Sequence, residues 1–85
     1  MAYSIFFSHT AERQFKKLKD AKLKERIASA FEYIAEEPFM GKPLQGEFKG
    51  YYSYRIGDYR MIYTFMKNKS SLTILRIENR KDVYR

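Results

Sequence analysis

The sequence predicts an α+β domain of order β-α-α-β-β-β, in which an antiparallel sheet carries a helical hairpin on one face. Three observations lead to this prediction: an apolar, aromatic stretch at the N-terminus, two stretches with helical hydrophobic spacing after it, and three strand-like stretches in the second half. A chain of 85 residues without a linker or repeat is expected to form a single domain over residues 1–85, with a small core.

The first half is expected to hold one strand and two helices. Residues 2–8, AYSIFFS, combine apolar, β-branched and aromatic side chains, which is typical of a strand. Ser8 or Thr10 is the expected cap of the first helix, Asp20 that of the second, and Pro38 ends the second. The expected buried stripes are Ala11, Phe15 and Leu18 in the first helix and Leu23, Ile27, Ala30, Phe31 and Ile34 in the second.

The second half is expected to hold a loop and three strands. Residues 39–50 contain three of the four glycines and are assigned to a loop. The strands are placed near 51–56, 59–66 and 71–77. Gly57-Asp58 separates the first two and suits the tight turn of a hairpin.

Counting outward from this turn places Arg55 directly opposite Arg60. Alternation then sends both arginines to the face away from the helices, and the apolar set Tyr52, Tyr54, Met61 and Tyr63 toward the helices. Like charges in facing positions destabilise a sheet by up to about 1 kcal/mol. The sequence therefore predicts that an anion lies between the two side chains.

The last strand and the C-terminal residues extend this basic face. With Leu75 and Ile77 assigned to the core, Arg76 falls beside the arginines, and Arg80, Lys81, Tyr84 and Arg85 follow it. Guanidinium groups bind phosphate through paired hydrogen bonds, which makes an RNA or DNA backbone the expected occupant. The alternative is that Asp58 and Glu78 neutralise the cluster and leave an ordinary solvated face.

Composition limits the classes of partner and compartment. The net charge of +7 and the 18% aromatic content favour polyanions such as nucleic acid, an anionic membrane or an acidic protein. Without cysteine there are no disulfides and no thiolate metal site, and we expect no cofactor. No signal peptide or membrane-length apolar run is recognised, so we expect a cytoplasmic protein that does not enter a membrane.

Two segments, KPLQGEFKGYYSYRIGDYRMIY (42–63) and TILRIENRKDVYR (73–85), resemble the RelE/ParE superfamily of toxins from type II toxin–antitoxin pairs. The likeness extends over nearly the whole chain. Its most specific parts are the Y-R-x-G-D-Y-R-x-x-Y hairpin and the R-x-x-V-Y ending.

The RelE branch of this superfamily implies a metal-independent, ribosome-dependent mRNA endoribonuclease (an mRNA interferase) that inhibits translation. By this resemblance, Arg60 contacts the scissile phosphate, and Arg80 and Tyr84 complete the catalytic set. Lys49, Arg55, Arg76, Lys81 and Arg85 are the expected RNA- or phosphate-binding residues. The implied partners are the ribosome with its mRNA, and a cognate antitoxin whose acidic, partly disordered segment covers the basic surface.

The chain also departs from the RelE pattern. Tyr51 and Ser53 stand where RelE has lysines, Asn79 stands where other nuclease members have a histidine, and the single histidine, His9, is expected at the first helix's start. No side chain is thus assigned as general base, although Lys49 or Tyr84 with a lowered pKa would serve. Two alternatives stay open: a ParE-type inhibitor of DNA gyrase without nuclease activity, and an inactive relative that only binds its antitoxin.

Overall fold

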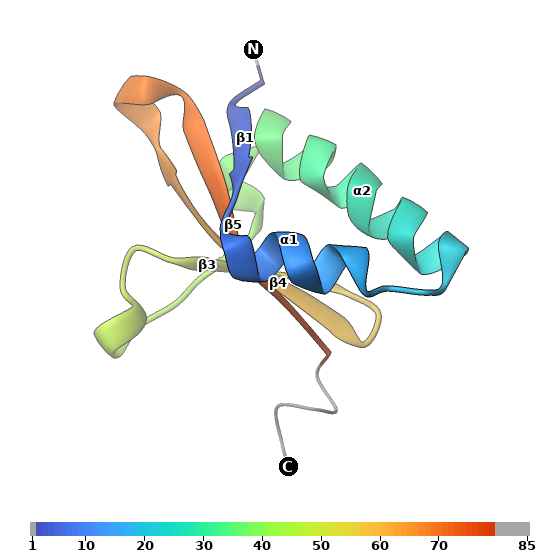
Figure 1. Ribbon diagram of the computed structural model, residues 1–85. Coiled ribbons are helices and arrows are strands. Elements are labelled where there is room, and N and C mark those ends of the chain that lie inside the picture. The colour runs from blue at the N-terminus through green and yellow to red at the C-terminus, as the bar shows by residue number, and fades with distance from the viewer. Residues whose placement is uncertain (1, 80–85) are drawn as a thin grey trace.

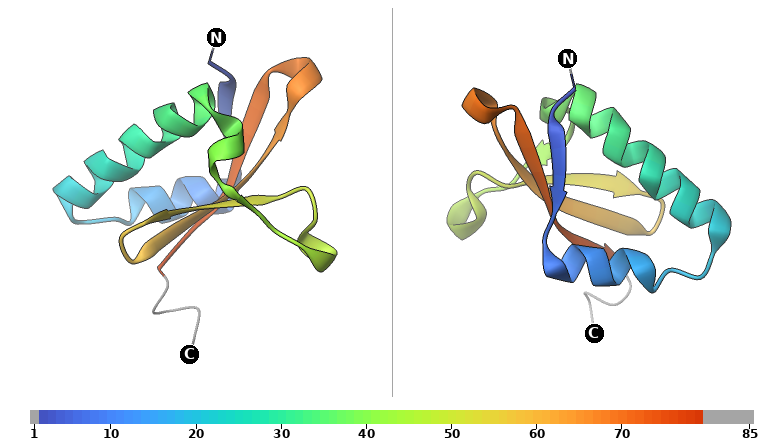
Figure 2. Two further views of the ribbon diagram at one scale, coloured as in Figure 1. Left: turned by 180° about the vertical axis from the view of Figure 1, so that it is seen from behind. Right: turned by 45° about the horizontal axis from the view of Figure 1, so that its top comes forward.

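The computed structural model describes residues 2–79, in which two helices lie on one side of a five-stranded sheet (Figures 1 and 2). The strand order is β1-β5-β4-β3-β2. The helices and strands are β1 (Ser4–Phe7), α1 (His9–Lys16), α2 (Ala21–Glu36), β2 (Lys42–Pro43), β3 (Tyr52–Ile56), β4 (Tyr59–Met66) and β5 (Ser71–Asn79). Three short 3₁₀ turns connect them: η1 (Pro38–Met40), η2 (Gly46–Phe48) and η3 (Lys67–Lys69).

The expected α+β class is confirmed, with two additions to the sheet. β1 pairs with β5 in parallel, so the sheet is mixed rather than wholly antiparallel. A two-residue strand, β2, forms inside the segment that was expected to be only a loop, and it pairs with β3. Neither pairing has a local signature, because strand order depends on which edges remain open once the hairpins have formed.

The helix starts follow the expected chemistry. The Ser8 hydroxyl accepts a hydrogen bond from the Ala11 amide at 3.0 Å, and Asp20 accepts from the amides of Lys22 and Leu23. Ser8 is therefore the first cap, and Thr10 lies inside α1. Both caps satisfy amides that have no partner within the helix.

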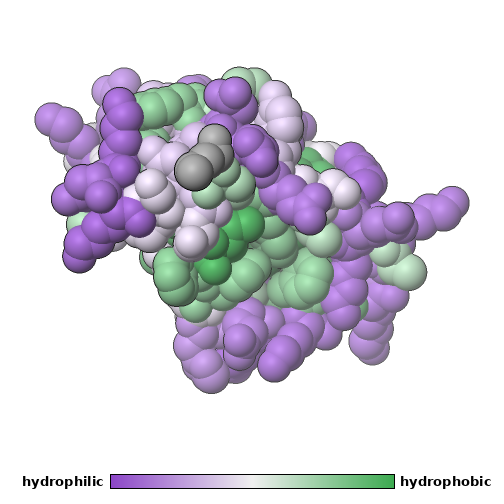
Figure 3. Space-filling view, turned by 90° about the horizontal axis from the view of Figure 1, so that it is seen from above, coloured by the Kyte–Doolittle hydropathy of each residue, from purple (hydrophilic) through white to green (hydrophobic). Residues whose placement is uncertain are grey.

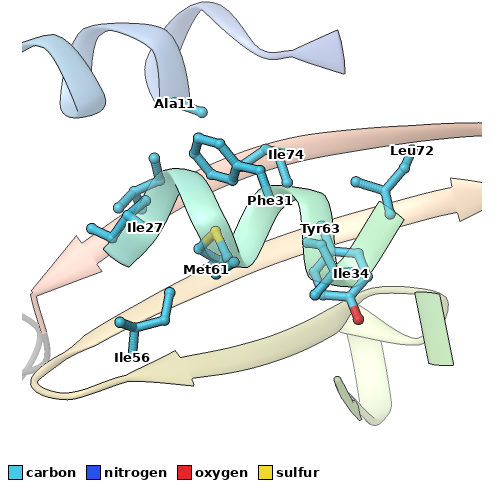
Figure 4. Packing of buried hydrophobic residues seen from close by; sticks show 11 residues of the cluster. Ala11, Ile27, Phe31, Ile34, Ile56, Met61, Tyr63, Leu72 and Ile74 are labelled. Carbon is cyan, nitrogen blue, oxygen red and sulfur yellow. The ribbon is translucent and has the colours of Figure 1, made fainter. Parts of the chain in front are cut away.

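The core lies between the helices and the inner face of the sheet, as Figure 4 shows. Ile27 and Ile34 of α2 are fully buried, and so are Met61 of β4 and Ile74 of β5. The helical stripes and the Met61 and Tyr63 positions expected from the sequence are confirmed as parts of this core. The helices therefore leave the other face of β3, β4 and β5 for the basic side chains.

α1 also covers the edge of β5 beyond the end of β1. The Ser8 amide donates to the Ile74 carbonyl at 2.9 Å, and the Ser8 hydroxyl donates to the Leu75 carbonyl at 2.7 Å. Further along, the Gln14 side-chain oxygen accepts from the Ile77 amide at 2.7 Å. These bonds replace the missing strand and hold the C-terminal half of β5 in place.

The buried Tyr63 hydroxyl ties the segment after α2 to the sheet. It donates to the Pro38 carbonyl at 2.7 Å and accepts from the Gly41 amide at 3.0 Å. Burial raises the pKa of Tyr63 above its ordinary value of 10.0, against the lowering effect of the Gly41 amide. Gly41 is required here, because a Cβ at this position would overlap the Tyr63 phenol ring.

Candidate anion-binding site

The β3–β4 hairpin has the register that the sequence predicts. Arg55 pairs with Arg60, Ile56 with Tyr59, and Gly57 occupies the turn with a φ of +57°, where glycine avoids a steric penalty. The two arginines therefore lie opposite each other on the face away from the helices. Their environments differ, which the sequence pattern does not reveal.

Arg55 is exposed and bends back toward its own turn. Its Nε donates to the Gly57 carbonyl at 3.2 Å, and its side chain does not line the cavity described below. Arg55 can thus add positive charge near the cavity without contacting a ligand inside it.

Arg60 lies deeper, beside Glu78 of β5, its partner in the β4–β5 register. The distance from Arg60 Nη2 to Glu78 Oε1 is 3.6 Å, which makes an ion pair but is too long for a hydrogen bond. Arg60 Nε is buried and has no hydrogen-bond partner among residues 2–79. The Arg60 side chain is 36% exposed, so its guanidinium can reach a ligand from solvent.

A break in the β4–β5 register shapes the floor of the site. Ile62 pairs with Arg76, but the next pair is Tyr63 with Ile74, so that Leu75 is an extra residue in β5. The expectation that Leu75 enters the core is wrong. Ile74 is buried instead, and Leu75 lines the cavity, because the bulge reverses the alternation of faces. Ile77, beyond the bulge, is buried as expected.

Arg60 and Arg76 line one cavity of about 490 Å³ on this face of the sheet. Arg60 and Arg76 come from neighbouring strands, and the connection between β2 and β3 forms the opposite wall. The lining residues are Leu44, Phe48, Tyr51, Arg60, Ile62, Leu75, Arg76 and Glu78. The cavity therefore combines two guanidinium groups with exposed aromatic rings, a combination that suits a phosphate joined to a base.

The remaining predicted residues fall outside this cavity. Lys49 is exposed, between the wall residues Phe48 and Tyr51, and is not among the lining residues. Arg80, Lys81, Tyr84 and Arg85 lie outside the described residues, so their roles stay predictions.

The sequence pattern does not identify the two aromatic residues of the cavity wall. Tyr51 was considered only as a replacement for a lysine, and its aromatic neighbour Phe48 gave no signal because the loop has no regular period. Glu78 was named only as a neutralising group, and the structure does pair it with Arg60. The β4–β5 register would have identified this pair if the bulge had been recognised.

Two further features are absent from residues 2–79. In that range no cluster of three or more histidine and carboxylate side chains has the arrangement of a metal site. Neither helix described there has the length and apolar character required to cross a membrane.

Comparison with known proteins identifies the family. Residues 5–84 match the family model for the ParE toxin of the type II toxin–antitoxin system parDE. Toxin RelG of Mycobacterium tuberculosis is 37% identical over 86 residues, covering 100% of this chain and 99% of the relative. Toxin RelE of the same organism is 29% identical and covers 98% of this chain and 87% of the relative.

Solved structures agree with this assignment. The RelBE2 toxin–antitoxin complex from Mycobacterium tuberculosis contains a chain that is 33% identical, with a TM-score of 0.84 over 94% of this chain and 100% of that chain. The isolated Escherichia coli toxin RelE, at 22% identity, shares the fold with a TM-score of 0.80 over 98% of this chain and 92% of its own. The chain therefore belongs to the ParE toxin family of type II toxin–antitoxin systems, within the RelE/ParE superfamily.

Proposed function

We propose that this toxin is a metal-independent endoribonuclease that cuts mRNA on the ribosome in the cytoplasm and so inhibits translation. The observation that carries the proposal is the Arg60 side chain, which is 36% exposed, lines the cavity together with Arg76, and contacts Glu78 only through a 3.6 Å ion pair. Guanidinium N–H groups that face the cavity would donate charge-assisted hydrogen bonds to the oxygens of an RNA phosphate.

The proposed chemistry is attack of a ribose 2′-hydroxyl on the adjacent phosphodiester. Negative charge then develops on the phosphorane oxygens, and Arg60 and Arg76 border the space where that charge would form. The rings of Phe48 and Tyr51 would stack on a neighbouring base and position the phosphate. Tyr84 is proposed to protonate the leaving 5′-oxygen, and Arg80 to neutralise charge, as the resemblance implies.

The proposed protein partner is an antitoxin with an acidic, partly disordered segment. Relatives with solved structures include RelBE toxin–antitoxin complexes from Mycobacterium tuberculosis, Escherichia coli and Pyrococcus horikoshii. A net charge of +7 would attract such a segment. Figure 3 shows apolar side chains gathered between hydrophilic ones at the end where the N-terminus lies, a surface that a folding segment would cover.

Inhibition of DNA gyrase is the second candidate, and the match to the ParE family model favours it. The residues at the lysine and histidine positions of nuclease relatives, Tyr51, Ser53 and Asn79, also favour it. On this reading the cavity would bind a protein carboxylate rather than an RNA phosphate.

One experiment separates the two candidates. The purified toxin is incubated with mRNA-programmed ribosomes and the cut ends are mapped, while gyrase supercoiling is measured in parallel. We expect ribosome-dependent cuts that decrease about 10²–10³-fold with Arg60→Ala, the loss typical of one donor to developing charge. Gyrase inhibition without cuts would refute the nuclease proposal.

A matched control removes the same charge elsewhere. Arg26 of α2 is exposed and does not line the cavity, so Arg26→Ala should cut at nearly the parent rate. Arg60→Lys keeps the charge but loses the planar pair of donors, and we expect it to recover only part of the activity.

A further inference from the structure

Glu78 is the one carboxylate among the described residues that line the cavity. Its side chain is 20% exposed, and the backbone beside it is fixed by the Gln14 bond to the Ile77 amide. A negative charge at this place repels a phosphate that binds to the same cavity. A carboxylate at this position therefore weakens RNA binding, which suggests that it has another function in the site.

The contact between Glu78 and Arg60 leaves the guanidinium available. Oε1 approaches only Nη2, at 3.6 Å, which is too long for a hydrogen bond, and the Arg60 side chain is 36% exposed and lines the cavity. A phosphate oxygen in the cavity can therefore bond to the exposed part of the guanidinium while the carboxylate remains in place beside it. Phosphate and carboxylate would then lie side by side on one guanidinium, with only a few ångströms between them.

This juxtaposition supplies the group that the proposed reaction lacks. Attack by a 2′-hydroxyl needs an acceptor for its proton next to the bound phosphate. No lysine or histidine lines the cavity within residues 2–79, whereas the Glu78 carboxylate does. Its fixed position on β5, opposite Arg60 in register, holds it close to the phosphate-binding nitrogens.

We propose that Glu78 is the general base of the cleavage reaction, an assignment that rests on the proposed nuclease function. A carboxylate oxygen of Glu78 takes the proton of the 2′-hydroxyl while the 2′-oxygen forms a bond to phosphorus. The bond from phosphorus to the 5′-oxygen breaks, and that oxygen takes a proton from water. The products are a 2′,3′-cyclic phosphate and a free 5′-hydroxyl, and Glu78 returns its proton to solvent.

The test is single-turnover cleavage of mRNA on ribosomes by Glu78→Gln, which keeps the shape of the side chain. General base catalysis contributes about 10²–10⁴-fold, and we expect a loss of this size in the rate at saturating toxin. Binding to the programmed ribosome should be unchanged or tighter, because a charge that repels phosphate has been removed. Glu12→Gln is the control, since Glu12 is also ion-paired, to Lys16 at 3.7 Å, but lies on α1 outside the cavity.

A second variant and a modified substrate test whether Glu78 acts as a base. Glu78→Asp retains a carboxylate on a shorter side chain and should restore part of the rate, which also covers the case in which the glutamine variant folds poorly. An mRNA with a sulfur in place of the 5′-oxygen has a leaving group that needs no proton. Glu78→Gln should remain slow on this substrate if Glu78 acts as the base, and recovery of the rate would overturn the assignment.

The failures can be told apart. Parent-rate or faster cleavage by Glu78→Gln would mean that Glu78 only neutralises Arg60, and would overturn this inference while leaving the nuclease function intact. A parent protein that makes no cut on ribosomes would overturn the nuclease function, and the base assignment with it.

Discussion

Removing the Tyr63 hydroxyl should lower the stability of the whole fold. Tyr63 is fully buried, and its hydroxyl makes two hydrogen bonds, to the Pro38 carbonyl and the Gly41 amide. Tyr63→Phe leaves both backbone groups without their partner, and an unsatisfied buried group costs about 1–3 kcal/mol. We expect a loss of about 2 kcal/mol in the free energy of unfolding, because the ring itself stays in place. For a domain of this size that loss lowers Tm by roughly 8–16 °C.

The assay is urea unfolding followed by circular dichroism, with a thermal melt of the same samples. Phe65, on the same strand, is only partly buried and serves as the control. Phe65→Leu removes an aromatic ring but no hydrogen bond, so its urea unfolding should not show the loss that is expected from the two hydrogen bonds of Tyr63. A loss below about 0.5 kcal/mol for Tyr63→Phe would refute the reasoning, since even one typical hydrogen bond contributes that much.

Three other predictions concern Tyr63, its neighbour Gly41, and the Ser8 cap of α1. Because the pKa of Tyr63 is raised, the folded chain keeps a proton above pH 10 that the unfolded chain releases. The free energy of unfolding should therefore fall as pH rises above 10. The urea midpoint of Tyr63→Phe should decrease less over the same pH range. Gly41→Ala should lower Tm, because its methyl group would lie 2.9 Å from a Tyr63 ring carbon; an unchanged melt would contradict this close approach. Ser8→Ala removes both the cap of α1 and the bond to the Leu75 carbonyl, and should cost about 1–3 kcal/mol in urea unfolding, whereas loss of a cap alone would cost about 1.

Much of the fold can be predicted because its signals are local. Gly57-Asp58 sets the hairpin register, and this register places Arg55 opposite Arg60. Ser8, Asp20 and the helical stripes likewise depend on neighbours in sequence. The parallel pairing of β1 with β5 joins distant segments and leaves no comparable trace.

The candidate site is less predictable, for a physical reason that β5 illustrates. Ile74 and Leu75 are adjacent and both apolar, so either one fits the core in a regular strand, and the pattern does not show which is inside. The structure buries Ile74 and inserts a bulge at Leu75. The wall formed by Phe48 and Tyr51 depends on packing of an irregular segment, which composition does not specify.

The bulge divides β5 into two parts whose side chains have different surroundings. Before Leu75, substitutions on this strand act on the domain interior, at Leu72 and Ile74, and therefore on the amount of folded protein. After it, Arg76 and Glu78 line the cavity, so substitutions at these two positions should change the site with little effect on folding. Libraries that randomise Arg76 and Glu78 while holding the rest of β5 constant, including the buried Ile77, would thus vary the site on an unchanged scaffold.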